Sequence, residues 1–581
     1  MLTDVELIKS KIDIVDFISS YANLKKAGRN FKGLCPFHSE KTPSFVVSPE
    51  RQTWHCFGAC NMGGDVISFY EKWEGVDFLE ALKTLAEKAG VILQKFTPTQ
   101  DSALKEKLYA VNNFAAEFYH YLLVSHKIGE RARKYLDERK ISREIIKTFQ
   151  LGYAPESWDS LNKFLSKKGY SDDLLSAAGL LIKSERGKFY DRFRGRLIFT
   201  LNDHRGKIIG FAGRLIPPSS DREAKYINSP ETPLYIKGNV LYGMDKTKEE
   251  IKAKGFAIIV EGEFDFLASY SSGITNVVAI KGSALTENQT LLLKRYTDTF
   301  YLALDSDFAG SEAAKRGIEI AEASGINVKI IKLLKGKDPA DCVAQGMHFW
   351  KKSVETSMPV YDFIIDSALL KFDKNDALGK KKIAESVIPF LSKIQNPIIA
   401  SHYIKLLTKA LSVTEESVET SIELFNKKKK LSPVPIPPEN QKKLRSELLE
   451  EHFLSLLLQS ADLNQSLKNA FEIVTPDDFV QSPVKTILAL LSEEVKKNDK
   501  FDIKKFNRAI TPEIAPVFDR AYLIDLGPLA KDEKLKEKEL TKTAREIKKI
   551  TLRRTIAEKS TLVGKLEDIK DLIQKLKELE A

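Results

Sequence analysis

Four residues that can bind zinc form two short pairs near the start of the chain. Cys35 and His38 are separated by two residues, Cys56 follows after seventeen more, and three residues separate Cys56 from Cys60. Two ligand pairs joined by a longer arm are typical of a chain that surrounds one tetrahedral zinc ion. Because four protein ligands would close the coordination shell, we predict a single structural zinc ion.

Alternatives remain for several parts of this cluster. The cysteines could simply be buried in a small core, and His55 competes with His38 because it adjoins Cys56. Neighbouring residues in a strand point to opposite faces, so we favour His38. The fourth cysteine, Cys342, is expected in a core. A basic group that precedes the cluster could contact phosphates or merely be solvated: Lys25, Lys26, Arg29 and Lys32.

Carboxylates form a second cluster, after three predicted strands. They are Glu261 after strand 256–260, Asp305 and Asp307 after strand 299–304, and Asp338 beyond strand 327–333. Ligands bind where the carboxyl ends of parallel strands leave a crevice, and carboxylates suit Mg²⁺ or Mn²⁺. Helix capping would account for one aspartate but not for four acids at one edge. We therefore predict a metal site that orients a triphosphate and an attacking oxygen.

Basic and aromatic residues accompany the acids. In "DRFRGR" three arginines alternate, so an extended backbone would place them on one face. The predicted polyanion-binding residues are Arg192, Arg194, Arg196, Arg214, Lys225, Tyr226 and Lys237. Each alone could be a surface charge, but together they suit a nucleic acid or nucleotide.

The surrounding pattern predicts the elements that position these residues. Helices are expected over 66–93 and from 104 to about 148, with a linker in "QKFTPTQDSA" between them. Strands are expected from 188 to 260, and segment 256–333 then alternates strand and helix, which indicates βαβ units around a mostly parallel sheet. Residues 360–426 and the C-terminal region read as helical, joined by a proline-rich and lysine-rich tether.

Length and composition bound the class of protein. At 581 residues, 43% hydrophobic and 29% charged, the chain should fold into about four globular domains. The net charge of +11 favours an acidic partner. No apolar run approaches about 18 residues and no signal peptide is evident, so we expect no membrane span and a cytoplasmic location. Four cysteines are too few for a disulfide framework.

The two clusters together resemble one family. "GRNFKGLCPFHSEKTPSFVVSPERQTWHCFG" is similar to the zinc domain of bacterial DNA primases, the DnaG family. "DRFRGRLIF", "GFAGR", "KYINSPET", "VEGEFD" and "DSDFAG" resemble the polymerase domain of the same family, in the same order over roughly residues 1–350. The resemblance implies a multidomain α+β and α/β fold: a zinc ribbon, a Toprim-type α/β catalytic core with a basic α+β subdomain, and a C-terminal helical bundle.

The resemblance also implies a function and roles for residues. The protein would be an enzyme, a DNA-dependent RNA polymerase that makes short primers de novo on single-stranded DNA from ribonucleoside triphosphates. Glu261, Asp305 and Asp307 would be catalytic and bind metal, with Glu261 alternatively assisting proton transfer, and Asp338 would be a further metal ligand. Template or nucleotide would be held by Arg139, Arg194, Arg214, Lys225, Tyr226 and Lys237.

The expected boundaries follow from pattern and resemblance together. They are a zinc domain over 1–98, the first part of the polymerase core over 105–250, a Toprim domain over 251–345, a helical part of the core over 346–426, a linker over 427–443, and a helicase-binding helical domain over 444–581. Two alternative functions are a non-catalytic helicase adapter that binds single-stranded DNA and another Toprim enzyme. A type IA topoisomerase would need a further domain carrying its tyrosine.

Three positions depart from the family pattern. Ala59 lengthens the usual C-x2-C to C-x3-C, and Ala340 stands where a second acid is usual, with Asp341 as its potential substitute. Glu263 in "EGEFD" places an additional charge near the metal site, for which the sequence offers no account.

Overall fold

The computed structural model divides the chain into two compact units, one of residues 1–96 with 435–581 and the other of residues 97–434. The described residues are 3–38, 40, 42–93, 100–216, 224–281, 285–303, 317, 320, 324–394, 396–431, 445–497, 501–506, 509–511, 513–530, 532–560 and 566–580. Within these ranges no helix is both long and apolar enough to cross a membrane.

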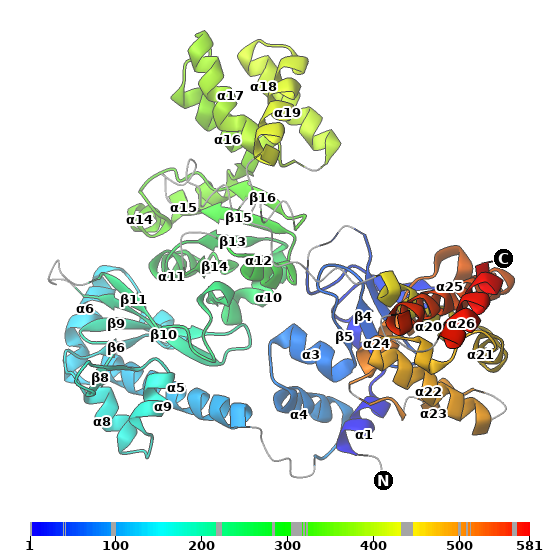
Figure 1. Cartoon of the computed structure of the whole chain (residues 1–581). Coiled ribbons are helices and arrows are strands. Elements are labelled where there is room, and N and C mark those ends of the chain that lie inside the picture. Colours follow the sequence, from blue (N-terminus) through cyan, green and yellow to red (C-terminus); the bar gives the residue numbers. More distant parts are fainter. Residues whose placement is uncertain are drawn as a thin grey trace. The chain divides into compact units, whose positions relative to one another are not determined.

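The first unit begins with a small zinc-ribbon fold (Figure 1). Its five-stranded antiparallel sheet has the order β1-β2-β3-β4-β5. The strands are β1 (Lys25–Ala27), β2 (Asn30–Gly33), β3 (Phe45–Ser48), β4 (Thr53–Cys56) and β5 (Gly63–Gly64), and the helices are α1 (Asp4–Lys11), α2 (Ile14–Ser19), α3 (Val66–Glu74) and α4 (Phe78–Ala89). Phe45, Trp54 and Phe69 are fully buried at its centre, where their rings contact one another.

The remainder of this unit is a helical bundle. Its helices are α20 (Arg445–Leu458), α21 (Leu463–Phe471), α22 (Ser482–Lys497), α23 (Ile503–Phe506), α24 (Ala515–Leu523), α25 (Glu533–Ser560) and α26 (Leu566–Glu580). Apolar side chains of α20, α22 and α24 form one core, which includes the buried Phe453, Leu488 and Phe518.

The second unit starts with helices around a four-stranded antiparallel sheet of order β11-β10-β9-β6. The helices are α5 (Gln100–Val124), α6 (Glu130–Glu138), α7 (Arg143–Thr148), α8 (Ser160–Ser166) and α9 (Asp172–Ala177). The strands are β6 (Gly152–Ala154), β9 (Arg196–Asn202), β10 (Ile208–Leu215) and β11 (Tyr226–Asn228), with β7 (Leu181–Lys183) and β8 (Phe189–Asp191) as a separate hairpin. Strands β9 and β10 are buried along almost their whole length, which explains their apolar sequences.

A six-stranded sheet follows, in the order β12-β14-β13-β15-β16-β17. Its four central strands are parallel and its two edge strands are antiparallel to their neighbours. The strands are β12 (Leu241–Tyr242), β13 (Ala257–Val260), β14 (Val277–Ile280), β15 (Thr299–Ala303), β16 (Asn327–Ile330) and β17 (Met358–Pro359), and the helices are α10 (Met244–Lys254), α11 (Glu263–Ser271), α12 (Glu287–Lys294), α14 (Pro339–Gln345) and α15 (Met347–Glu355). The predicted alternation of strand and helix is therefore confirmed over the described residues.

Four further helices complete this unit: α16 (Val360–Lys371), α17 (Ala377–Leu391), α18 (Pro397–Leu411) and α19 (Glu415–Leu431). Buried residues of α16 to α18, such as Ile365 and Leu407, share a core with Ile259 and Leu302 of the parallel sheet. These helices are therefore continuous with the sheet domain.

Both predicted linkers are shorter than expected at the ends that the structure describes. Residues 100–103 of "QKFTPTQDSA" are the first turn of α5, and residues 427–431 continue α19. The first lysine of the run, Lys427, is exposed on this helix and lies 3.8 Å from Glu423 one turn earlier, a favourable spacing for opposite charges. The rest of both linkers, 94–99 and 432–443, falls outside the described residues.

Candidate functional site

The structure brings the four predicted zinc ligands together. One ligand atom from each of Cys35, His38, Cys56 and Cys60 lies within 4.8 Å of the other three. Cys35 Sγ is 3.6 Å from Cys60 Sγ, and Cys56 Sγ is 3.8 Å from His38 Nδ1. Sulfur and nitrogen atoms at such separations fit around one tetrahedral zinc ion, whose bonds are about 2.0 to 2.3 Å long.

A second layer of groups orients this cluster. Glu40 Oε2 lies 3.2 Å from His38 Nε2, the ring nitrogen opposite Nδ1, and Glu40 also accepts a hydrogen bond from the Cys35 amide at 2.7 Å. A carboxylate behind a ligating imidazole fixes its tautomer and orientation. A glycine at position 58 leaves room for these groups, because a Cβ atom there would lie 2.7 Å from both Glu40 Oε2 and His38 Nε2 and would displace them.

His55 points away from the cluster, toward Asn61 Oδ1 at 3.3 Å and the ring of Phe57. It precedes Cys56 in β4, so the two side chains lie on opposite faces of the strand. Burial lowers the pKa of His55 to about 4, which keeps the imidazole neutral at physiological pH. Cys342 is fully buried in the core of the second unit, as the sequence predicted.

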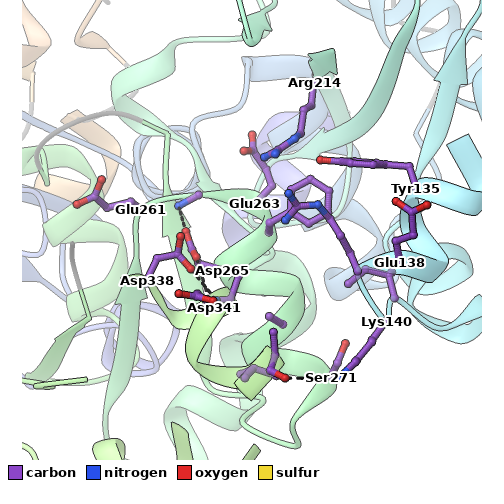
Figure 2. Close-up of a pocket in the computed structure, with 18 of the residues that line it drawn as sticks. Tyr135, Glu138, Lys140, Arg214, Glu261, Glu263, Asp265, Ser271, Asp338 and Asp341 are labelled. Carbon is purple, nitrogen blue, oxygen red and sulfur yellow. Dashed lines mark hydrogen bonds between the residues drawn. The ribbon is translucent and has the colours of Figure 1, made fainter. Parts of the chain in front are cut away.

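One pocket of the second unit gathers the carboxylates at the carboxyl end of β13 (Figure 2). Glu261 follows that strand directly, and Asp338 lies at the start of α14 in the same pocket wall. Asp265 and Asp341 complete the acidic side of the pocket. Asp305 and Asp307 lie outside the described residues. Among the residues that are described, the zinc cluster is the one group of three or more His, Cys, Asp or Glu that could hold a single metal ion.

Two of these acids also hold the backbone of the pocket. Asp338 caps α14 by accepting a hydrogen bond from the Asp341 amide at 2.7 Å. Asp265 accepts one from the Gly262 amide and one from the Ala340 amide, both at 3.2 Å, and so links α11 to α14. Capping, the simpler interpretation of an aspartate in this position, therefore applies to Asp338 whether or not it also binds metal.

The additional acid, Glu263, is paired inside the pocket wall. Lys281 donates to Glu263, and their side chains are 3% and 9% exposed. Burial lowers the pKa of Lys281, and the nearby charges of Glu263 and Lys237 act in opposite directions on it. Glu263 therefore adds no net charge to the metal site, because its own cation accompanies it.

The opposite wall of the pocket is basic and aromatic. The Arg214 guanidinium lies 4.7 Å from the centre of the Phe264 ring and donates to the hydroxyl of Tyr226. Arg139 lies 4.5 Å from the same ring and 5.0 Å from that of Tyr135. Burial raises the pKa of Tyr226 to about 12, so this phenol stays protonated at neutral pH. The stack fixes two planar cations in the lining of the pocket that also holds the carboxylates.

Some of the predicted basic residues lie elsewhere. The three arginines of "DRFRGR" do not share a face, because the chain leaves β8 at Asp191 and turns through Gly195, at φ +62°, before β9 begins. Arg194 stacks on Trp158 and donates to the Asp191 carbonyl, while Arg196 is buried and donates to the Ala224 carbonyl. Four of the predicted residues do not line the pocket: Arg192, Arg194, Arg196 and Lys237. Four others do line it: Arg139, Arg214, Lys225 and Tyr226.

The sequence interpretation missed several residues that line the pocket: Tyr135, Glu138, Lys140, Phe264, Asp265 and Lys281. Lys281 could have been found, because it directly follows strand β14 at the same sheet edge as Glu261. Tyr135 and Lys140 carry no comparable signal, since they come from α6 and the loop after it, far away in sequence.

Most of the chain matches domains of known protein families. Residues 2–101 match the CHC2 zinc finger, residues 118–248 the N-terminal domain of the DNA primase catalytic core, and residues 258–343 the Toprim-like domain. Residues 361–416 match the DnaB-helicase binding domain of primase. These matches define a zinc-ribbon protein with a Toprim-type primase core.

Curated relatives narrow the class to one family. The DNA primase of Halalkalibacterium halodurans is 36% identical over 420 residues, 71% of this chain and 69% of the relative, and that of Staphylococcus epidermidis is 32% identical over 516 residues, 86% of this chain and 85% of the relative. The chain belongs to the DNA primase family. The crystal structure of the Aquifex aeolicus primase (zinc binding and RNA polymerase domains) is 34% identical and covers 72% of this chain and 99% of its own, with a TM-score of 0.47.

The region that matches the helicase-binding domain differs from the region that we expected to bind helicase. We expected helicase binding by residues 444–581, whereas the family match covers 361–416. That segment spans α16 to the start of α19 and shares its core with the parallel sheet, while α20–α25 share a separate core.

Proposed function

We propose that the pocket between the acidic sheet edge and the arginine–aromatic wall carries out the nucleotidyl transfer of RNA primer synthesis. The enzyme is a DNA primase, a DNA-dependent RNA polymerase that starts short chains de novo on single-stranded DNA from ribonucleoside triphosphates. One observation carries this proposal: carboxylates at the carboxyl end of β13 and stacked guanidinium groups line the same pocket. Such opposed walls suit a triphosphate, whose metal ions need carboxylates and whose phosphates need cations.

The acidic residues have the role of holding divalent metal. We assign Glu261, Asp305, Asp307 and Asp338 to Mg²⁺ or Mn²⁺, with Glu261 placed at the end of the central strand β13. When bound, the metal would neutralise the phosphates and orient the attacking oxygen. Asp338 is already fixed by its cap hydrogen bond, so it would meet a metal ion with little loss of side-chain freedom.

The basic wall has the role of binding the polyanions. Arg139 and Arg214 are held planar against Phe264, and Lys225 and Tyr226 extend the wall. Guanidinium groups in a fixed plane can donate to phosphate oxygens in pairs. We assign Arg194 and Lys237 to template or nucleotide contacts outside this pocket.

The zinc ribbon has a separate role. Cys35, His38, Cys56 and Cys60 are the proposed ligands of one structural zinc ion, and the ribbon would contact template during initiation. The C-x3-C spacing created by Ala59 is compatible with this set, because Cys60 reaches the other three ligand atoms. The metal has no open position in such a set, so it stabilises the fold and takes no part in chemistry.

We further propose the replicative helicase as a partner, at the replication fork in the cytoplasm. Two segments are candidates for its docking surface, α16–α19 and the bundle α20–α26. A chain ending at residue 431 and a chain comprising residues 445–581 separate them, because each retains one candidate and lacks the other. If the bundle docks, only the second piece binds helicase by calorimetry.

The test of the central function is primer synthesis without a primer. Purified protein, single-stranded DNA, ribonucleotides and Mg²⁺ should give short RNA chains, and the Asp307→Asn variant should give none. A helicase adapter without catalysis would give no RNA with either protein, and another Toprim enzyme would instead relax supercoils or cleave DNA.

A further inference from the structure

The zinc ribbon packs against the helical bundle within the first unit. Strands β3, β4 and β5 contact helix α24, which lies beside β4 and β5 (Figure 1). Val46 of β3 is 5% exposed and belongs to the apolar core of the bundle, and Phe57 packs against the same core. The contact therefore joins two regions that are separated by most of the chain.

Charged and aromatic groups complete this interface. Arg51 forms an ion pair with Asp519 of α24, with side chains only 4% and 9% exposed. The Arg51 guanidinium also lies 4.3 Å from the centre of the Phe518 ring. Burial raises the pKa of Asp519, and the Arg51 charge opposes this. Exposed ion pairs contribute little, but a buried pair makes each partner depend on the other.

Two further cations of the ribbon contact the bundle at more exposed positions. Arg29 lies 4.2 Å from the centre of the Tyr522 ring and donates to the Tyr522 carbonyl at 3.1 Å. Lys32 Nζ lies 3.3 Å from a carboxylate oxygen of Asp525, two residues beyond the end of α24. In return, the Tyr522 hydroxyl donates to Glu50 of the ribbon at 2.6 Å.

In both ion pairs across this interface, the cation belongs to the ribbon and the carboxylate belongs to the bundle. Arg29, Lys32 and Arg51 come from the ribbon, while Asp519 and Asp525 come from the bundle. Carboxylate oxygens and aromatic faces are also what a single-stranded nucleic acid would present, as phosphates and bases. Helix α24 thus offers the ribbon the groups that a polyanion would offer, and Arg51 cannot meet a phosphate while it is buried against Asp519.

We propose that α24 and the Asp525 turn form an internal docking surface that competes with single-stranded DNA for Arg29, Lys32 and Arg51. The chain then has a closed form, in which the ribbon lies on its own bundle, and an open form, in which these cations are free. Single-stranded DNA binds the open form and shifts the population toward it. This inference rests on the proposed function only in taking the ribbon as a template-binding element.

The first test is a zero-length cross-link in the full chain. Carbodiimide activates a carboxylate, and the Lys32 amine then displaces the activating group to form an amide with Asp525. Mass spectrometry should find this Lys32–Asp525 link in a monomeric product, and added oligo(dT) should suppress it. A link joining two chains, no link, or a link unaffected by saturating oligo(dT) would overturn the proposal.

The second test measures the affinity of the full chain for single-stranded DNA. The Asp519→Asn, Asp525→Asn double variant of the full chain should bind labelled oligo(dT) about tenfold more tightly at low salt, because the closed form no longer withholds binding. Its log-log salt dependence should be steeper, since each additional phosphate contact adds about 0.7 to the slope. Asp571→Asn with Glu578→Gln, both exposed on α26, makes the same change of net charge and is the control.

Equal affinity of the variant and this control would overturn the proposal, since the gain would then be general electrostatics. Zinc content, measured on every variant, shows that the ribbon is still folded. Primer synthesis is scored separately, so a protein that makes no primers contradicts the proposed function, whereas a protein that makes primers but shows neither cross-link nor affinity change contradicts only this inference.

Discussion

Lys281 and Glu263 form a buried ion pair in the wall of the candidate active site. Glu263 is the first residue of α11, and Lys281 directly follows β14, the neighbouring strand of the sheet. A carboxylate at a helix N-terminus is favoured by the exposed amides, and the lysine balances its charge. The pair thus stabilises the junction from which Glu261 projects.

Breaking this pair should destabilise the second unit. Glu263→Gln leaves a buried lysine without its counter-charge and should cost about 3 kcal/mol of unfolding free energy, measured by urea denaturation. The Glu263→Gln, Lys281→Met double variant should recover most of that loss, because no uncompensated charge remains. Glu287→Gln, an exposed residue on the first turn of α12, is the control and should change little. A double variant as unstable as the single one would contradict the pairing.

Arg214 should be sensitive even to a conservative change. Arg214→Lys keeps the charge but loses the planar stack on Phe264 and the hydrogen bond to Tyr226. We expect primer synthesis to fall about tenfold or more, with unfolding free energy changed far less. Arg143→Lys, an exposed residue of α7, should leave synthesis unchanged. Normal synthesis by Arg214→Lys would remove Arg214 from the polyanion site.

Asp338 allows capping and metal binding to be separated. Asparagine caps helices as well as aspartate does, so Asp338→Asn should keep the thermal midpoint of the protein. It supplies a poorer metal ligand, so primer synthesis should fall about 10- to 100-fold, with partial recovery at high Mg²⁺. If synthesis is unchanged across a Mg²⁺ titration, Asp338 is a helix cap and nothing more.

Asp191 should make the second unit less stable as pH rises. Burial raises its pKa from 3.8 to about 6, despite hydrogen bonds from the Leu161 and Asn162 amides. The folded state therefore binds more protons than the unfolded state between these values, so this contribution is present below pH 4 and lost as pH rises through about 6. The effect on unfolding free energy is about 2 kcal/mol between pH 4 and 7.5.

Hydrogen exchange of the peptides around β8 and α8 measures this dependence. Asp191→Asn cannot ionise, so its local stability relative to the wild type should improve by that amount from pH 4 to pH 7.5. Asp173→Asn, an exposed residue of α9, provides the matched control. A constant difference between Asp191→Asn and the wild type would show that the pKa of Asp191 is not raised.

Features that depend on local pattern were predictable from the sequence. The apolar runs at 257–260 and 277–280 specified buried parallel strands, and the spacing of Cys35, His38, Cys56 and Cys60 specified the zinc cluster. Alternation along β4 was enough to choose His38 over His55. Periodicity and ligand spacing are short-range signals, so they survive without knowledge of the fold.

Contacts between distant segments were not predictable. Arg51 and Asp519 are 468 positions apart, and nothing near either residue indicates the other. The stack of Arg139 and Arg214 on Phe264 likewise joins three segments that are far apart in the sequence. The conformation of "DRFRGR" was misjudged for another reason, because a turn at Gly195 interrupts the alternation that an extended chain would have. Each of these features depends on tertiary structure, which local sequence patterns do not reveal.

The separate roles of the zinc ribbon and the Toprim pocket are tested most directly by comparing two variants in two assays. Cys60→Ala should lose zinc and primer initiation while retaining some extension of a pre-annealed RNA primer, because the ribbon acts in initiation and the Toprim pocket performs the transfer. Glu261→Gln should retain zinc and lose both initiation and extension. If Glu261→Gln instead extended primers at the wild-type rate, or if Cys60→Ala kept full zinc and full initiation, the assignment of these two sites would be wrong.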